Sequence, residues 1–117
     1  MSPESWPARL ATVADAAEVA RLLHDFNTEF DTPSPGPAVL EARLGDLLAG
    51  DAVFAILAGD PAVGVALITL RPNVWYAGSV ALLDELYVEP PLRGRGIGSG
   101  MIELLMSQVR ERGADLV

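Results

Sequence analysis

The feature that most constrains the fold is a glycine-rich segment between a strand-like run and a helix-like run. Residues 83–100 read LDELYVEPPLRGRGIGSG, and the next residues, MIELLMSQVRERG, place apolar side chains at helical spacing. Glycines let neighbouring backbone N–H groups approach one anion without an intervening Cβ, and a helix start adds partial positive charge. The sequence therefore predicts a phosphate-binding loop at a strand-to-helix junction.

Spacing separates this loop from two familiar nucleotide-binding loops. A P-loop needs G-x-x-x-x-G-K-[ST], but all eight basic residues of this chain are Arg and none is Lys. The dinucleotide pattern G-x-G-x-x-G fails in every register of the loop glycines, and no strand-turn-helix of that kind occurs near the N-terminus. Both patterns are therefore excluded.

Composition limits the remaining classes of function. The 117 residues predict a single domain over residues 1–117, and the net charge of −8 argues against a nucleic-acid partner. Because the chain has no Cys, it has no disulfide, thiolate metal site or Cys nucleophile. The longest apolar run, residues 62–70, is too short to cross a bilayer and no signal peptide is evident. We expect a cytoplasmic protein with no membrane partner.

The rest of the chain predicts an α/β (α+β) fold with a mixed sheet. Apolar spacing changes from helical to alternating after residue 50, and three prolines break the chain between residues 31 and 37. The strand at residues 80–89 is apolar on both faces except at its acidic pair, which predicts a central position. The expected elements are strand 8–11, helix 13–29 with a Thr12/Asp15 capping box, a helix ending at Gly50, strands 52–58 and 62–71 joined at Gly59-Asp60, strand 80–89, helix 99–112 capped by Gly113, and the start of a further strand.

The spacing R-x-x-G-x-G, written here as Arg93-Gly94-Arg95-Gly96-Ile97-Gly98, resembles the acyl-coenzyme A loop of the GCN5-related N-acetyltransferase (GNAT) superfamily. The resemblance covers most of the chain, since ARLATVADAAEVARLL is similar to the family's first strand and helix. It implies a mostly antiparallel sheet flanked by helices. It also implies that the sequence ends at Val117 before the last strands and helix of that fold.

The resemblance implies acetyl-CoA (coenzyme A) as cofactor. Loop amides would hold its diphosphate, with Arg93 and Arg95 adding positive charge. The backbone edge of the preceding strand would bond the pantetheine arm, a bulge in that strand would open the slot, and the Val88 amide would hold the thioester carbonyl. The cofactor-binding residues expected are Leu86, Tyr87, Val88, Arg93, Gly94, Arg95, Gly96, Ile97, Gly98 and Ser99.

Two acids on the same strand are the candidates for the catalytic base. Acetyl transfer to an amine needs the neutral amine, so a nearby carboxylate would accept the ammonium proton. Strand alternation would place Asp84 and Glu85 on opposite faces, with Asp84 on the face of Leu86 and Val88. We expect Asp84 first and Glu85 second, the alternative being that either pairs with an Arg or caps an amide. The family's general acid, a Tyr in a later helix, has no counterpart, and Tyr87 is expected to pack.

The resemblance also implies an acceptor site near the end of the first helix. Acids there would attract a cationic amine and an aromatic ring would form a wall, the alternative being a solvated helix end. Two adjacent aromatics in the loop before residue 80 would line this site or form a dimer contact. The substrate-binding residues expected are Glu29, Phe30, Asp31, Trp75 and Tyr76.

These expectations combine into an N-acetyltransferase that moves an acetyl group from acetyl-CoA to a primary amine of a small molecule or peptide. Without Cys, direct attack in a ternary complex is the simplest route, and no metal is implied. The alternative is a non-catalytic acyl-CoA-binding or partner-binding domain of the same fold. An unpaired strand at the sheet edge would favour a homodimer or a domain swap. Nucleotide binding, in which ATP would displace coenzyme A, is the least favoured alternative.

Overall fold

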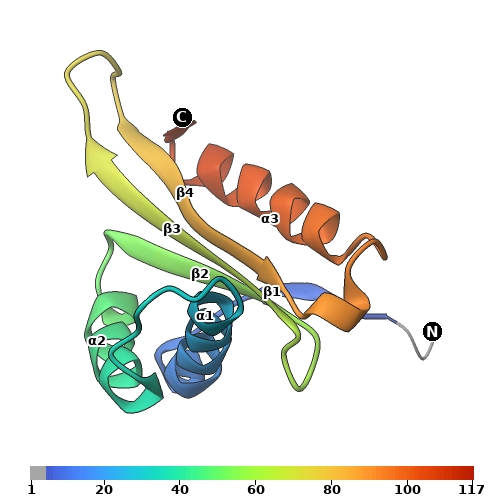
Figure 1. Cartoon of the computed structure of the whole chain (residues 1–117). Helices are drawn as coiled ribbons and strands as arrows, with labels where there is room; N and C mark the ends of the chain where they lie inside the picture. The colour runs from blue at the N-terminus through green and yellow to red at the C-terminus, as the bar shows by residue number, and fades with distance from the viewer. Residues whose placement is uncertain (1–4) are drawn as a thin grey trace.

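The computed structural model describes residues 5–117, which form one five-stranded sheet with helices on both faces (Figure 1). The elements, in chain order, are β1 (Ala8–Leu10), the 3-10 helix η1 (Val13–Asp15), α1 (Ala16–Glu29), α2 (Pro37–Ala49), β2 (Val53–Ala58), β3 (Gly64–Pro72), β4 (Ser79–Val88), the 3-10 helix η2 (Pro90–Leu92), α3 (Ile97–Glu111) and β5 (Asp115–Leu116). Strands β1 to β4 pair antiparallel in sequence order, and β5 joins β4 in parallel. This confirms the mixed, mostly antiparallel sheet. Over residues 5–117, no helix combines the length and apolar character that crossing a membrane requires.

The turn from β1 into the first helical segment is fixed by Asp15. Its carboxylate accepts the Thr12 backbone N–H at 2.7 Å and the two terminal nitrogens of Arg9 at 2.8 and 3.0 Å. The Arg9 hydrogen bond, followed by that of Thr12, holds the pKa of Asp15 well below its usual range. The expected pairing of Thr12 with Asp15 is confirmed.

Two hydrophobic clusters lie on opposite sides of the sheet. Figure 1 shows α3 against one side, while α1 and α2 cover the other. Alternate residues of β2 and β3 divide between these two faces, as the pleat of a strand requires. The α1/α2 face includes Ala55, Leu57, Val65 and Leu67, and the α3 face includes Phe54, Ile56, Ala66 and Ile68.

A β-bulge in β4 interrupts this alternation. Leu83 pairs with Ile68 and Glu85 pairs with Leu67, so Asp84 is an extra residue without a partner on β3. The family resemblance implied a bulge in this strand, and the structure places it at Asp84.

The faces of β4 therefore exchange along the strand. Ahead of the bulge, the odd-numbered Ala81 and Leu83 pack on the α3 face. Beyond it, the even-numbered Val88 lies on the α3 face and the odd-numbered Tyr87 on the α1/α2 face. A single alternation, with odd-numbered side chains on one face and even-numbered side chains on the other, therefore does not hold along the whole of β4.

β3 is the middle strand of the sheet, and β4 lies between β3 and β5. Within residues 5–117, β5 pairs with β4 at Val80 and Ala81, and the Val117 N–H donates to the Ala81 carbonyl at 3.1 Å. In that part of the chain no strand pairs with the outer edge of β4 after Ala81. Strands thus pair with both edges of β4 at Val80 and Ala81, which confirms there the interior position predicted for residues 80–89.

The end of α3 packs closely against the start of β4. Gly113 has a φ of 66°, its N–H donates to Arg110, and the Ala114 N–H donates to Val109 at 3.0 Å, which confirms the predicted cap. A Cβ built on Gly78 would lie 2.4 Å from the Gly113 carbonyl oxygen. The two backbones meet there with no room for a side chain.

Candidate active site

The glycine-rich segment links η2 to α3 and exposes backbone donors. Gly94 and Gly96 have φ values of 80° and 83°, in the left-handed region that glycine adopts most easily. The Gly100 N–H donates to the Gly96 carbonyl at 3.1 Å and begins the helical ladder. Among residues 5–117, no backbone carbonyl accepts a hydrogen bond from the amides of residues 97–99. These amides therefore have no backbone acceptor, as is usual for the first residues of a helix.

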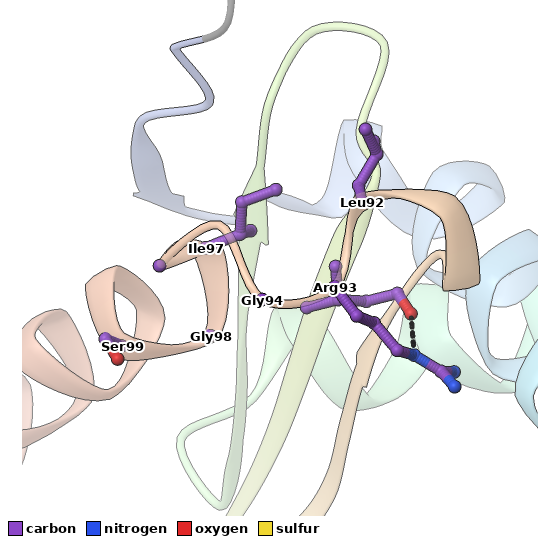
Figure 2. Close-up of a pocket in the computed structure, with 8 residues that line it drawn as sticks. Leu92, Arg93, Gly94, Ile97, Gly98 and Ser99 are labelled. Carbon is purple, nitrogen blue, oxygen red and sulfur yellow. Dashed lines mark hydrogen bonds between the residues drawn. The ribbon is translucent and has the colours of Figure 1, made fainter.

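A pocket of about 260 Å³ lies over these amides, and Figure 2 shows the loop residues around it. A Cβ added at Gly94, Gly96, Gly98 or Gly100 would meet no atom within 4 Å, so the backbone is open to an approaching group. Converging N–H groups at a helix start suit a diphosphate. The lining residues are Val88, Leu92, Arg93, Gly94, Gly96, Ile97, Gly98 and Ser99. They include the expected loop residues except Arg95, and Leu92 is an addition.

The guanidinium of Arg93 pairs with Glu29 instead of reaching over the loop amides. Its terminal nitrogens donate to the two Glu29 oxygens at 2.9 and 2.6 Å, and Nε donates to the Val88 carbonyl at 2.9 Å. Figure 2 shows the side chain extending away from Gly98 and Ser99, with the Nε bond dashed. The hydrogen bonds to Glu29 raise the pKa of Arg93. Arg93 was expected to add positive charge near a phosphate, and Glu29 was expected to attract a cationic amine. In the structure the two side chains pair with each other.

The backbone of β4 turns only alternate residues toward its outer edge. The Glu89 N–H donates to the Val63 carbonyl on the β3 side at 2.9 Å. By the alternation of an antiparallel ladder, Tyr87 also directs its backbone groups toward β3, while Leu86 and Val88 direct theirs outward. The pantetheine contact expected from the Tyr87 backbone is therefore wrong, and the outward groups belong to Leu86 and Val88.

Asp84 and Glu85 lie on the same face of the sheet, contrary to the sequence-based expectation. The Thr69 hydroxyl donates to the Asp84 carboxylate, and Thr69 shares the α1/α2 face with Leu67 by strand alternation. Asp84 therefore does not share the face of Val88. The bulge is the cause, because its extra residue sets two successive side chains on one side.

A second pocket, of about 410 Å³, lies between β4 and the end of α1. Its lining residues are Phe26, Asn27, Phe30, Thr32 and Glu85. Burial raises the pKa of Glu85, and the neighbouring Asp84 charge raises it further. This pocket thus combines two aromatic rings with a carboxylate that binds a proton more readily than usual.

Sequence reasoning placed Phe30 at this pocket but missed three of its lining residues. Phe26 was detectable, because it precedes Phe30 by one helical turn. Asn27 and Thr32 carried no comparable signal. Asp31, with a φ of 54°, lies in the turn after α1 and does not line the pocket.

Trp75 and Tyr76 lie in the loop that closes the β3–β4 hairpin, away from both pockets. Their exposed fractions are 85% and 43%. Leu67 pairs with Glu85 and Pro72 with Ser79, so this loop begins about 17 Å along the hairpin from Glu85. Figure 1 shows the hairpin extending past the helices. Trp75 and Tyr76 were expected to line the acceptor site or to form a dimer contact. The first of these expectations is wrong within one chain, because the loop lies beyond the second pocket along the hairpin.

A row of side chains connects the two pockets. Arg93 lies 5.6 Å from the centre of the Tyr87 ring, and Tyr87 stacks on Phe26 with 5.2 Å between ring centres. Phe26 meets Phe30 edge-on at 5.4 Å. Tyr87 is buried and burial raises its pKa, so its predicted packing role is confirmed.

Comparisons with known proteins agree on one family. The family model described as "Acetyltransferase (GNAT) family" matches residues 16–117, while a search of curated proteins found no match. A solved structure of a "putative acetyltransferase" from Arthrobacter sp. FB24 is 52% identical, covers 99% of this chain and 74% of its own, and has a TM-score of 0.87. The ribosomal-protein-alanine N-acetyltransferase of Brucella melitensis biovar Abortus 2308 is 25% identical over 96% of this chain and 80% of its own, with a TM-score of 0.76. A "predicted acetyltransferase with acetyl-CoA" from Clostridium acetobutylicum is 20% identical over 96% of this chain and 80% of its own and shares the fold, with a TM-score of 0.78.

Proposed function

The chain belongs to the acetyltransferase (GNAT) family, and from this premise we propose that it transfers an acetyl group from acetyl-CoA to a primary amine. One observation carries the proposal: the two pockets lie at opposite ends of one short segment of β4. Val88 lines the glycine-loop pocket and Glu85 lines the α1 pocket. About 10 Å of strand separates them. A donor anchored at the loop and an amine in the second pocket would meet along this segment, which supports direct attack in a ternary complex.

The donor side of the site suits acetyl-CoA. This molecule supplies an acetyl group as a thioester and carries a diphosphate at a distance from it. The amides of residues 97–99 offer hydrogen bonds and the helix dipole to the diphosphate. The outward backbone groups of Leu86 suit the amides of the pantetheine arm. The outward N–H of Val88 suits the thioester oxygen, which becomes more negative during attack.

Glu85, rather than Asp84, is the proposed base. Glu85 lines the acceptor pocket, whereas the carboxylate of Asp84 accepts the Thr69 hydroxyl. A raised pKa makes Glu85 a better acceptor for the proton of an entering ammonium group. The neutral nitrogen then bonds to the acetyl carbon as the carbon–sulfur bond breaks, and the second proton of the nitrogen balances the departing thiolate.

The acceptor side favours a cationic amine joined to an apolar or aromatic group. Phe26 and Phe30 supply apolar walls, Asn27 supplies a polar edge, and Glu85 supplies the negative charge. The relative named as a ribosomal-protein-alanine N-acetyltransferase supports transfer to nitrogen. An amine on a small molecule or a peptide satisfies these features.

The test uses the whole chain with acetyl-CoA and a panel of polyamines, amino acids, aminoglycosides and peptides. Thiol release together with acetylated product, identified by mass spectrometry, is the expected result for at least one amine. Isothermal titration with coenzyme A tests the donor half separately, and absence of binding would contradict it. Tight binding with no turnover on any amine would support the non-catalytic alternative. Binding of ATP in preference to coenzyme A would support the nucleotide alternative.

A further inference from the structure

The peptide bond that follows Val88 is held at both of its polar ends. Its carbonyl oxygen accepts a hydrogen bond from Arg93 Nε at 2.9 Å. Its N–H, which belongs to Glu89, donates to the Val63 carbonyl at 2.9 Å. Because a peptide unit is planar, these two bonds fix the plane on the C-terminal side of the Val88 Cα. The adjoining plane, which carries the Val88 N–H, is restricted through the same Cα.

Arg93 is itself held in one orientation by a residue from a distant part of the chain. Glu29, at the end of α1, accepts from both terminal nitrogens of Arg93 at 2.9 and 2.6 Å. A two-point contact of this kind fixes the plane of the guanidinium as well as its position. The Tyr87 ring lies 5.6 Å from the guanidinium carbon. Glu29 thus determines where Nε of Arg93 points, and Nε holds the Val88 carbonyl.

We propose that Glu29 is a positioning residue that acts through Arg93 and the Val88 peptide to direct the Val88 N–H at the thioester carbonyl of acetyl-CoA. The inference rests on the proposed function and deepens it, because it gives a role to a side chain outside both pockets. Glu29 lines neither pocket, and its contact with the glycine loop is made through Arg93, which lines the loop pocket. Its effect is confined to how strongly the thioester oxygen is hydrogen-bonded.

A positioning role predicts a different result from that of a brace, meaning a contact between Glu29 and Arg93 that only holds the glycine loop in place. Loss of a brace would loosen the loop and weaken coenzyme A binding. Loss of a positioning contact would leave the loop amides in place and weaken only the bond to the thioester oxygen. A well-aimed donor to a developing oxyanion is worth about 10²–10³ in rate, and a misdirected one loses part of that. We expect about tenfold slower acetyl transfer for Glu29→Gln, with coenzyme A affinity within about threefold of the unmodified chain.

The experiment measures the infrared band of acetyl-CoA labelled with carbon-13 at the thioester carbonyl. In the unmodified chain the band is expected below its position in free acetyl-CoA, because a hydrogen bond weakens the C=O stretch. Glu29→Gln and Arg93→Lys, which lose the two-point contact, are expected to lose at least half of that shift. The control is Asp15→Asn, which removes the Arg9 two-point pair away from the loop and is expected to keep the full shift.

The outcomes separate the inference from the function on which it rests. No binding of acetyl-CoA to the unmodified chain would overturn both. Binding with an unchanged band in Glu29→Gln would overturn the inference alone. A loss of coenzyme A affinity that accounts for the whole rate loss would identify a brace and also overturn it. If Glu29→Gln fails to fold, Arg93→Lys is judged by its infrared band alone, because Arg93 lines the glycine-loop pocket and its replacement also changes coenzyme A binding.

Discussion

The hydroxyl of Thr69 on β3 donates a hydrogen bond to the carboxylate of Asp84 on β4. This contact holds the bulge residue on the face where Glu85 lies, and it occupies the acid that the sequence favoured as the base. Glu85 instead opens into the pocket beside α1. The two adjacent acids therefore have different surroundings, and the following experiments separate their roles.

Replacing Glu85 with Gln removes the proposed base while keeping the side-chain shape. We expect kcat to fall about 10²–10⁴-fold near pH 7, the usual contribution of a positioned base. Coenzyme A affinity should stay constant, since Glu85 does not line the loop pocket. Glu41→Gln, an exposed change on α2, is the matched control. Equal turnover by Glu85→Gln and the unmodified chain would assign proton removal to another group.

The pH dependence of the rate reports the influence of Asp84 on Glu85. A base must be deprotonated, so activity rises as the pH passes above the pKa of Glu85. Burial and the Asp84 charge both raise that pKa, so Asp84→Asn removes the second cause and lowers it. The acidic limb of kcat/KM against pH should move to lower pH. An unmoved limb, or one that moves upward, would contradict the assignment.

Gly98→Ala should separate ligand binding from stability. The new Cβ meets no protein atom within 4 Å, and Ala favours a helix over Gly by up to about 1 kcal/mol. The melting temperature should not fall, but the methyl group adds bulk beside the loop amides and should weaken coenzyme A binding about tenfold. Gly45→Ala in α2 also meets no atom within 4 Å and lies outside the described pockets. It should keep full affinity, and an equal loss in both variants would refute the loop site.

Gly78→Ala should destabilise the fold without touching either pocket. Its Cβ would lie 2.4 Å from the Gly113 carbonyl oxygen, a backbone atom, so the end of α3 or the start of β4 must move. We expect a loss of about 1–3 kcal/mol in the free energy of unfolding, measured in urea. Gly50→Ala, whose Cβ would be 3.7 Å from the nearest atom, should change it much less.

The Asp15 carboxylate should make stability depend on acidic pH. Its pKa is lowered in the folded chain, so its stabilisation is present above the unfolded value of 3.8 and is lost as the pH falls through the folded value. Asp15→Asn keeps an acceptor for Thr12 but loses the charge that pairs with Arg9. The variant should be less stable by about 1 kcal/mol at pH 7, with the difference closing below pH 3.8. A constant difference across this range would show that the charge contributes nothing.

Much of the fold was predictable because its signals are local. The helical spacing of α1 and α3, the Gly59-Asp60 turn and the loop glycines each act within a few residues. The same holds for the glycine-loop pocket, which is lined by consecutive residues of one segment. These features need no knowledge of what packs against them.

The parts that were missed depend on partners distant in the sequence. Whether Asp84 is an extra residue depends on how β4 pairs with β3, and strand alternation alone gave the wrong face. Arg93 is 64 residues from Glu29, so its charge could be assigned to phosphate but not to that carboxylate. Trp75 was expected near the acceptor site because the sequence does not show how β3 and β4 pair. That register sets the length of the hairpin and thus the distance from Glu85 to Trp75.

Because Asp84 has no partner on β3, β4 could lose this residue without any change in how its other residues pair with β3. A chain lacking that residue would still set Leu83 opposite Ile68 and Glu85 opposite Leu67. It would lose the local bend and the side-by-side carboxylates, while every neighbouring pair stayed as it is. In a related sequence, a one-residue gap at this position would therefore indicate that the pair of acids is changed while the sheet is the same.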